Sequence, residues 1–223
     1  MENTCIRLVI ATSLDGKIAL SENNKVHLGG RGDRQVLEES LAWSDATIMG
    51  ANTLKVHEST CLISNPKLID KRQAKGKGNQ PISIIISRKN AFCFDWEFFN
   101  QPIDRWLLTT KKEREKNIPK TGFVKHLTIQ SNWAKTISKL RKKGIFNIVI
   151  LGGAELASSL LKEDQIDELQ LTFTPRVIGG LKSWFQAKNN NFPIDLTRRE
   201  SWSLKELKDL GEDEFLVRYH RER

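Results

Sequence analysis

Two short glycine motifs, each lying between an apolar run and a helical pattern, most constrain how this chain can fold. Gly50-Ala51-Asn52-Thr53 follows the apolar run 46–49, and Leu151-Gly152-Gly153-Ala154 ends the apolar run 145–151. Glycine has no Cβ, so such a turn lets another group approach the backbone closely. The helix that follows adds unpaired N–H groups and a positive dipole end, which favour a phosphate. Two such turns in one chain predict a nucleotide bound at the carboxyl ends of sheet strands.

The rest of the chain alternates strand and helix patterns. It predicts a single α/β domain over 1–223, with three layers, a mostly parallel central sheet and an antiparallel C-terminal hairpin. Strands are expected at 6–12, 46–49, 82–86, 106–109, 145–151 and 168–175, and helices at 34–43, 132–143 and 154–162, with a further helical start near Thr53.

Polar residues and glycines mark the expected ends of these elements. Asp33 is predicted as the N-cap of the first helix, and Ser131 or Asn132 as the N-cap of helix 132–143. The stretch 64–80 contains one proline and two glycines and is predicted as an exposed loop. The final strands, 202–207 and 215–220, are expected to join across Asp209-Leu210-Gly211.

Composition excludes several classes of protein. The 223 residues are 39% hydrophobic and 28% charged, which suits one globular domain with a sizeable core. No apolar stretch approaches the ~20 residues that a membrane span needs, and the N-terminus has no signal-peptide pattern. Cys5, Cys61 and Cys93 are widely spaced, which predicts free thiols in the cytoplasm and no metal site.

The net charge of +9 admits nucleic acid, anionic small molecules or mere solubility as explanations. The basic residues are scattered over several segments, and no zinc-finger spacing, RNA-stacking signature or leucine heptad accompanies them. We therefore expect no nucleic-acid partner. A nucleic-acid-binding domain remains a third hypothesis, which predicts steeply salt-dependent binding to a generic duplex.

Several motifs together resemble one known family. They are 11–18 (ATSLDGKI), 44–53 (SDATIMGANT), 151–157 (LGGAELA), 166–169 (IDEL) and 175–179 (PRVIG). In this order and spacing the chain resembles the reductase domain of the bifunctional riboflavin-biosynthesis deaminase/reductase, which has a dihydrofolate reductase-like fold. The zinc motif of the deaminase half is not in the sequence, so the resemblance implies a stand-alone reductase.

The resemblance implies a reaction and a cofactor. NADPH would reduce the open-chain form of a phosphoribosylamino-pyrimidine to the ribitylamino product, as 5-amino-6-(5-phosphoribosylamino)uracil reductase does. The cofactor-binding residues carried over are Ala11, Asp15, Gly16, Lys17, Ile18, Gly50, Thr53, Ser87, Arg88, Gly152, Gly153, Ala154, Glu155 and Leu156. Ala11 and the turn 15–18 would border the nicotinamide, and the two glycine turns would hold the pyrophosphate.

Ser87 and Arg88 follow a buried strand and resemble the Ser-Arg pair that dihydrofolate reductases place on the adenosine 2′-phosphate. A hydroxyl and a guanidinium at a strand end suit a dianion, because arginine offers paired, charge-assisted hydrogen bonds. The pair favours NADPH over NADH. Surface residues that simply end a strand remain the alternative explanation.

The substrate side departs from the family pattern. Leu151 stands where the family has a glutamate, and Leu41 where it has an arginine. Loss of such a group removes an interaction that discriminates a polar substrate. The substrate-binding candidates are Lys25, His27, Arg31, Arg34, His57, Glu58 and Leu151, with Lys55 as a further cation for a ribose phosphate.

The catalytic acid is not identified by the sequence. Water is the expected proton donor, and Glu58 is a candidate if burial raises the pKa of its carboxyl. A pterin reductase is a lesser alternative, because Asp33 is interpreted as a helix cap. A nucleotide-binding protein without substrate chemistry is another. Related reductases form homodimers, and the strand 169–178 with the C-terminal hairpin is the expected interface.

Overall fold

The computed structural model describes residues 4–19, 28–89, 91–112, 122–185 and 192–223. They fall into two compact units. The first unit consists of Met1–Thr4 and Glu38–Val149, and the second of Cys5–Leu37 and Ile150–Arg223. Within the described ranges, no helix has the length and apolar character needed to cross a bilayer. That the whole chain is one domain stays a prediction.

The first unit is built on parallel strands. Their order is β7 (Asn147–Ile150), β3 (Ala46–Gly50), β4 (Ile82–Ile86), β5 (Arg105–Thr109) and β6 (Lys125–Thr128). Ile84, Ile85 and Leu107 are fully buried, as expected for strands covered on both faces. The prediction lacked β6, because this edge strand has one buried apolar residue, Leu127, among polar neighbours.

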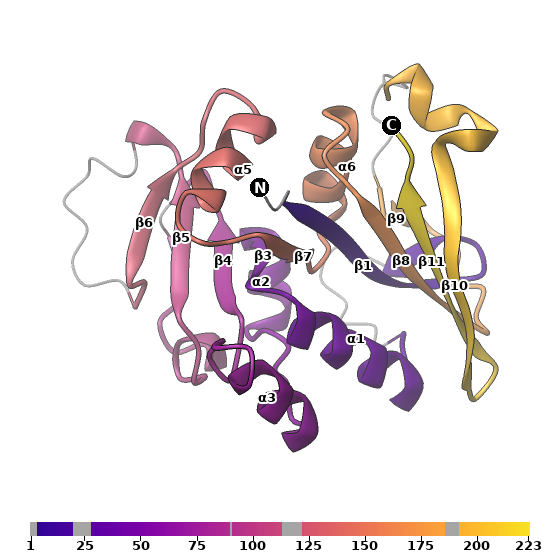
Figure 1. Cartoon of the computed structure of the whole chain (residues 1–223), viewed down its shortest axis with the longest axis horizontal. Coiled ribbons are helices and arrows are strands. Elements are labelled where there is room, and N and C mark those ends of the chain that lie inside the picture. The colour runs from indigo at the N-terminus through magenta and orange to yellow at the C-terminus, as the bar shows by residue number, and fades with distance from the viewer. Residues whose placement is uncertain (1–3, 20–27, 90, 113–121, 186–191) are drawn as a thin grey trace. The chain divides into compact units, whose positions relative to one another are not determined.

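Helices cover both faces of these strands. The elements are α2 (Ala51–His57), α3 (Pro66–Gln73), the short 3-10 helix η1 (Glu97–Phe99) and α5 (Trp133–Arg141). The connections β3–β4 and β6–β7 run in opposite directions, so right-handed crossovers place α3 and α5 on opposite faces (Figure 1). The side chain of Asn132 accepts a hydrogen bond from Lys135 N at 2.9 Å, which confirms Asn132 as the cap of α5.

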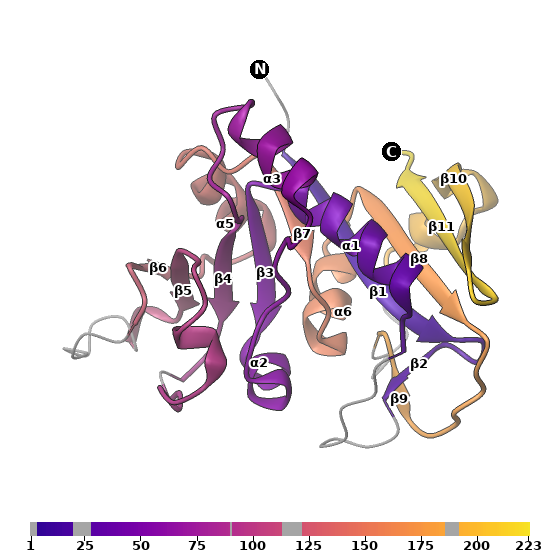
Figure 2. The same ribbon diagram turned by 90° about the horizontal axis from the view of Figure 1, so that it is seen from below.

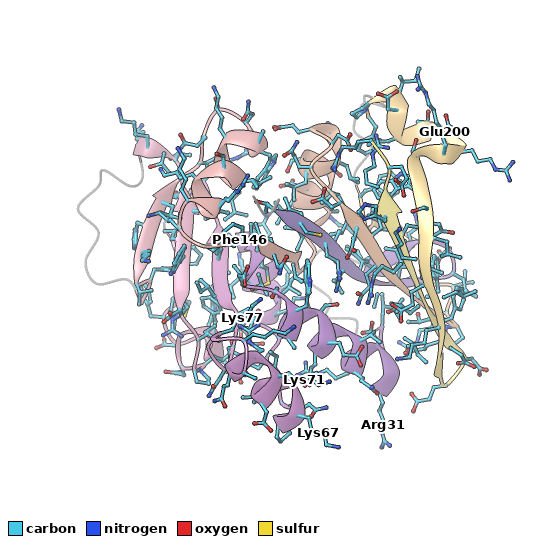
Figure 3. The ribbon with its side chains drawn as sticks, in the orientation of Figure 1. Arg31, Lys67, Lys71, Lys77, Phe146 and Glu200 are labelled. Carbon is cyan, nitrogen blue, oxygen red and sulfur yellow. The ribbon has the colours of Figure 1, made fainter. Side chains whose placement is uncertain are left out.

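Helix α3 lies inside the stretch 64–80, so the prediction of a loop there was wrong. Asn65 caps the helix by accepting a hydrogen bond from Lys67 N at 3.0 Å, and Pro66 occupies its first position. The helix has little apolar character, which is why its pattern was missed. Lys67 and Lys71 are exposed on its outer side (Figure 3), and the buried Arg72 holds it to the rest of the unit.

In the main sheet, the strands of the second unit form one parallel pair and two antiparallel pairs. The order is β10 (Trp202–Gly211), β11 (Glu214–Arg221), β8 (Glu168–Thr174) and β1 (Cys5–Ser13), and only β1 and β8 are parallel. With the first unit, this confirms the mostly parallel sheet and its antiparallel C-terminal hairpin. The other elements are α6 (Ala154–Lys162), the β2–β9 pair (Lys17–Ala19 and Lys182–Ser183), η2 (Ile194–Thr197) and η3 (Arg199–Ser201).

The C-terminal hairpin turns later than predicted. Strand β10 continues through Asp209-Leu210-Gly211, and the turn falls on Glu212 and Asp213, whose φ angles are 55° and 59°. A two-residue turn with positive φ at both positions matches the twist of the strands. Gly211 instead lies at a register shift within the ladder, so its glycine signal marked an irregularity and not the turn.

Helix α1 (Arg31–Trp43) starts three residues before its predicted beginning. Asp33 therefore lies in its first turn, and the prediction of Asp33 as the N-cap was wrong. The N-terminal end is held instead from far along the chain, because Gly30 N donates to the two carboxylate oxygens of Glu214 at 2.8 and 3.0 Å. In this unit the first half of α1 and α6 lie on opposite sides of β1 and β8 (Figures 1 and 2).

Candidate functional site

The carboxyl ends of three parallel strands meet at one edge of the first unit. Gly50 of β3 is aligned with Ile86 of β4, and Ile86 is aligned with Leu108 of β5. Ser87 and Thr109, the next residues of their segments, therefore lie at the same edge as Gly50. Figure 2 shows α2 leaving this edge directly from β3. The structure thus brings together the predicted phosphate residues of this unit.

Gly50 has free space where a side chain would be. Its φ of −73° is open to any residue, and a Cβ added there would meet no atom within 4 Å. Neither backbone geometry nor packing among the described residues requires glycine at this position. A group bound against the backbone would use that space. Thr53 follows, half-buried, in the first turn of α2.

Ser87 shapes a tight turn at the end of β4. Its hydroxyl donates to Lys89 O and accepts from Lys89 N at 3.2 Å, and Ser87 N donates to Leu108 O at 3.0 Å. The turn presents Arg88 and Lys89, which are both exposed. The structure thus gives the Ser87 hydroxyl a local role, and contact with a phosphate stays a prediction for both Ser87 and Arg88.

Thr109 adds a polar group at this edge that the sequence did not indicate. It is fully buried, and its hydroxyl oxygen has no hydrogen-bond partner among the described residues. Leaving a buried hydroxyl unpaired costs about 1–3 kcal/mol. No sequence signal separated it from an ordinary strand-ending threonine.

The second glycine turn has a backbone that only glycine adopts readily. Gly152 and Gly153 have φ angles of 75° and 88°, and Gly153 is the N-cap of α6. Its carbonyl accepts the first helical hydrogen bond from Ala157 N at 2.9 Å. The N–H groups of Ala154, Glu155 and Leu156 precede that bond, so they are the orphan donors of the helix. The glycine backbone expected for this turn is therefore present, and phosphate binding there stays a prediction.

Asp15 turns out to hold a turn together. Its carboxylate accepts hydrogen bonds from the Ser13 hydroxyl at 2.5 Å, Gly179 N at 2.8 Å and Ile178 N at 3.2 Å. The bond from Ser13 and those from the two amides lower the pKa of Asp15. The carboxylate thus ties two of the sequence motifs, 11–18 and 175–179, together.

The residues that follow Asp15 in the sequence complete the turn after β1 and form the short strand β2. Lys17 and Ile18 lie on β2, which pairs with β9, and the Gly16 carbonyl accepts a hydrogen bond from the Ser183 hydroxyl at 3.1 Å. Ala11 is half-buried on β1, beside Thr172 of β8. Gly152 faces β1, since a Cβ on it would lie 3.9 Å from Ile10 Cδ1.

The predicted substrate residues of the second unit are accessible. Arg31 and Arg34 are exposed in the first turn of α1, and Arg31 extends away from the helix in Figure 3. Leu151 is half-buried directly before the glycine turn. Lys25 and His27 lie outside the described residues.

In the first unit, the predicted substrate residues His57, Glu58 and Lys55 are exposed at the end of α2. Glu58 closes the helix in the left-handed conformation, with a φ of 57°, and its N–H bonds to Leu54 O at 2.6 Å. The burial that would make Glu58 a suitable acid is not found. Leu41 is fully buried, so the position expected to hold a substrate-binding arginine belongs to the core.

Asp33, which sequence reasoning interpreted as a helix cap, has a carboxyl group in partly buried surroundings. Burial raises the pKa of its carboxyl, the negative charge of Glu214 adds to the rise, and a hydrogen bond with the Thr172 hydroxyl opposes it. A Cβ on Gly29 would clash with the carboxyl of Asp33. Three glycines among residues 29–32 were the available signal, because they indicate close approach of another group to this backbone.

Neither of two cavities in the first unit is lined by the predicted site residues. One of about 590 Å³ lies at the amino ends of β3, β4 and β5, the edge opposite Gly50, and is lined by Asp45, Ile82 and Asp104 among others. Another of about 620 Å³ runs along the exposed side of α5. The strand registers and glycine turns therefore define the candidate site better than cavity volume does.

Comparison with known proteins identifies the family. The model of the RibD C-terminal domain matches residues 4–213. The 2,5-diamino-6-ribosylamino-4(3H)-pyrimidinone 5′-phosphate reductase of Archaeoglobus fulgidus is 23% identical over 178 residues, which are 78% of this chain and 81% of that protein.

Solved structures show the same fold. RibD of Acinetobacter baumannii aligns with a TM-score of 0.79 and 20% identity over 99% of this chain, which spans 59% of that protein. Dihydrofolate reductase of Enterococcus faecalis aligns with a TM-score of 0.54 and 14% identity over the full length of both chains. The dihydrofolate reductase-like fold is therefore confirmed, and the chain belongs to the RibD C-terminal domain family.

Proposed function

We propose that this chain is an NADPH-dependent reductase of riboflavin biosynthesis that acts on 5-amino-6-(5-phosphoribosylamino)uracil or a closely related phosphoribosylamino-pyrimidine. Membership of the RibD C-terminal domain family supports the reaction class, as does the name of the Archaeoglobus relative. The observation that carries the proposal is the Gly152-Gly153 turn, whose positive φ angles open α6 with its orphan N–H groups.

The residues present fit a phosphate-bearing nucleotide in each unit. In the second unit, the N–H groups of 154–156 would bind phosphate oxygens, and Ala11 with the turn 15–18 would border the nicotinamide. In the first unit, Gly50 has space for a bound group, Thr53 offers a hydroxyl, and the turn 87–89 offers two exposed cations to a 2′-phosphate. When bound, NADPH supplies two electrons and a hydrogen to the substrate carbon, and the protein supplies orientation.

For the substrate, the exposed guanidinium groups of Arg31 and Arg34 would bind its phosphate. The family's arginine and glutamate are replaced by Leu41 and Leu151, so we expect weaker discrimination at the pyrimidine. Burial of Leu41 in the core also supports a second candidate function: a protein that binds NADPH and has lost pyrimidine reduction. Turnover of the phosphoribosylamino-pyrimidine separates the two.

We further propose a homodimer that uses the C-terminal hairpin. Leu204, Leu207 and Phe215 are large apolar side chains exposed on β10 and β11, and Phe215 stacks on Phe173 of β8 with ring centroids 5.0 Å apart. Covering such side chains with a second copy would remove apolar area from water. Analytical ultracentrifugation that finds a monomer at micromolar concentration would refute this assembly.

Titration with NADPH and NADH tests the cofactor. Replacing Arg88 with alanine removes charge-assisted hydrogen bonds worth about 1.5–3 kcal/mol, so the Kd for NADPH should rise about 10- to 150-fold while the Kd for NADH stays unchanged. Lys71→Ala is the matched control, because Lys71 is an exposed cation on α3, away from the strand ends (Figure 3). If the wild-type protein binds neither nucleotide, the proposed function is wrong.

A further inference from the structure

Arg72 of α3 is a buried cation of the first unit, and its side chain forms hydrogen bonds only to backbone carbonyls. The residue is 2% exposed. Its Nη1 donates to three carbonyls around the C-terminal end of α1, and its Nε donates to Gly78 O at 2.8 Å. Burial lowers the pKa of Arg72, and the charge of Asp45 opposes this. Among the residues that the structure describes, no carboxylate forms an ion pair with this guanidinium.

One nitrogen of the guanidinium is available to a further partner. Within the described part of the chain, Nη2 of Arg72 donates no hydrogen bond. Arg72 also lines the cavity of about 590 Å³ at the amino ends of β3, β4 and β5. A buried charged group costs free energy unless its N–H groups are paired. The cavity is therefore the place where an acceptor for Nη2 can bind.

The other charged residues of this cavity indicate the charge of the ligand. Lys77 Nζ pairs with Asp45 Oδ1 at 2.6 Å and donates to Trp43 O at 2.7 Å. The second oxygen of Asp45 accepts hydrogen bonds from two backbone amides, so this pair is satisfied internally. Asp104, which is exposed, brings a second carboxylate to the lining. A monoanion therefore meets less repulsion here than a dianion such as phosphate.

The donor set and the apolar walls indicate the rest of the ligand. Paired binding of two oxygens by arginine uses two nitrogens in a fork, but Nη1 and Nε of Arg72 are both bonded to carbonyls. Nη2 alone suits the oxygen of a carboxylate. Ile82, Pro102 and Ile103 line the same cavity and offer apolar contact area. Sites for small molecules combine such walls with a few polar groups that fix the ligand's orientation.

We propose that this cavity binds a small organic monocarboxylate. Its carboxylate accepts hydrogen bonds from Arg72 Nη2, and its apolar part packs on Ile82, Pro102 and Ile103. The cavity lies at the amino ends of the strands, whereas Gly50 and the turn 87–89, which the proposed function assigns to the cofactor, lie at the carboxyl ends. The two sites are separate, and neither proposal depends on the other.

The test follows the Arg72 guanidinium by nitrogen-15 NMR during titration with isovalerate at constant ionic strength. The Nε–H signal is assigned by its loss in Arg72→Lys. Isovalerate should shift this signal saturably, whereas isovaleramide, which has the same shape without the charge, and sodium chloride should not. Pro102→Trp places a large side chain at an exposed position of the lining and should abolish the saturable shift. Ala134→Trp is the matched control, because Ala134 is exposed in the other cavity, on α5.

Thermal unfolding gives a second readout that needs no substituted cavity wall. A ligand that binds only the folded protein raises Tm, so isovalerate at ten times its Kd should raise the wild-type Tm by about 3–6 °C. Arg72→Lys keeps the charge but lacks Nη2, and it should lose this gain. The proposal is overturned if isovalerate does not shift the Arg72 signal or if isovaleramide shifts it equally. Tighter binding of inorganic phosphate than of isovalerate would also overturn it.

Discussion

Replacing Arg72 with methionine tests how the first unit secures the C-terminal end of α1. Arg72 is 2% exposed on α3. Its Nη1 donates to the carbonyls of Leu41, Ala42 and Ser44 at 2.9, 3.1 and 2.6 Å, and its Nε donates to Gly78 O at 2.8 Å. The last carbonyls of a helix have no partner within it, so Arg72 satisfies groups that burial would otherwise penalise.

The cost follows from the carbonyls that lose this donor. Leu41 O retains hydrogen bonds from Ser44 N and from the Ser44 hydroxyl, at 3.2 and 3.0 Å. The carbonyls of Ala42, Ser44 and Gly78 lose Arg72. At about 1–1.5 kcal/mol for each lost bond, the free energy of unfolding should fall by about 3–4.5 kcal/mol. Methionine keeps much of the apolar volume of the stem, so cavity formation adds little.

Urea denaturation at pH 7 measures this difference. Arg72→Met should lower the midpoint without changing the m-value, because the surface exposed on unfolding is nearly the same. Lys71→Met is the matched control. Lys71 precedes Arg72 on the same helix but is exposed (Figure 3), so its replacement should stay within about 0.5 kcal/mol of the wild type. An Arg72→Met variant within about 1 kcal/mol of the wild type would refute the argument.

Three further outcomes are expected. Gly152→Ala forces alanine into a φ of 75°, which costs about 1–2 kcal/mol, and it should also weaken NADPH binding in a fluorescence titration. Asp15 has a lowered pKa in the folded protein, so its carboxylate stabilises the fold at pH values above its unfolded pKa of 3.8, and this stabilisation is lost as pH falls. Asp15→Asn should therefore flatten the acid limb of a profile of thermal stability against pH. Asp33 has a raised pKa in the folded protein, so ionisation of its carboxyl opposes folding at pH values above its unfolded pKa of 3.8. Asp33→Asn should therefore be more stable than the wild type at pH 7, and this gain should disappear below pH 3.8. A wild-type acid limb in Asp15→Asn, or no gain in Asp33→Asn, contradicts these assignments.

Features that depend on neighbours in the chain were predictable from the sequence. Helix α6 has the predicted bounds, because an apolar periodicity follows directly on two glycines. The buried strand 82–86 was likewise visible as a continuous apolar run between turn residues. Glycine pairs announce positive φ angles locally, so the backbone of the Gly152-Gly153 turn could be expected without knowledge of the fold.

Features that depend on distant segments were decided by the tertiary structure alone. The sequence around Asp33 is typical of a helix cap. In the structure, however, Glu214 of β11 accepts the hydrogen bond from Gly30 N at the start of α1. The carboxyl of Asp33 is instead partly buried beside the Thr172 hydroxyl. Helix α3 lacks an apolar pattern because its buried anchor is the guanidinium of Arg72, whose partners lie on α1 and in the following loop. Local patterns record backbone preference and burial, whereas hydrogen-bond partners and pKa values depend on which distant groups folding brings within reach.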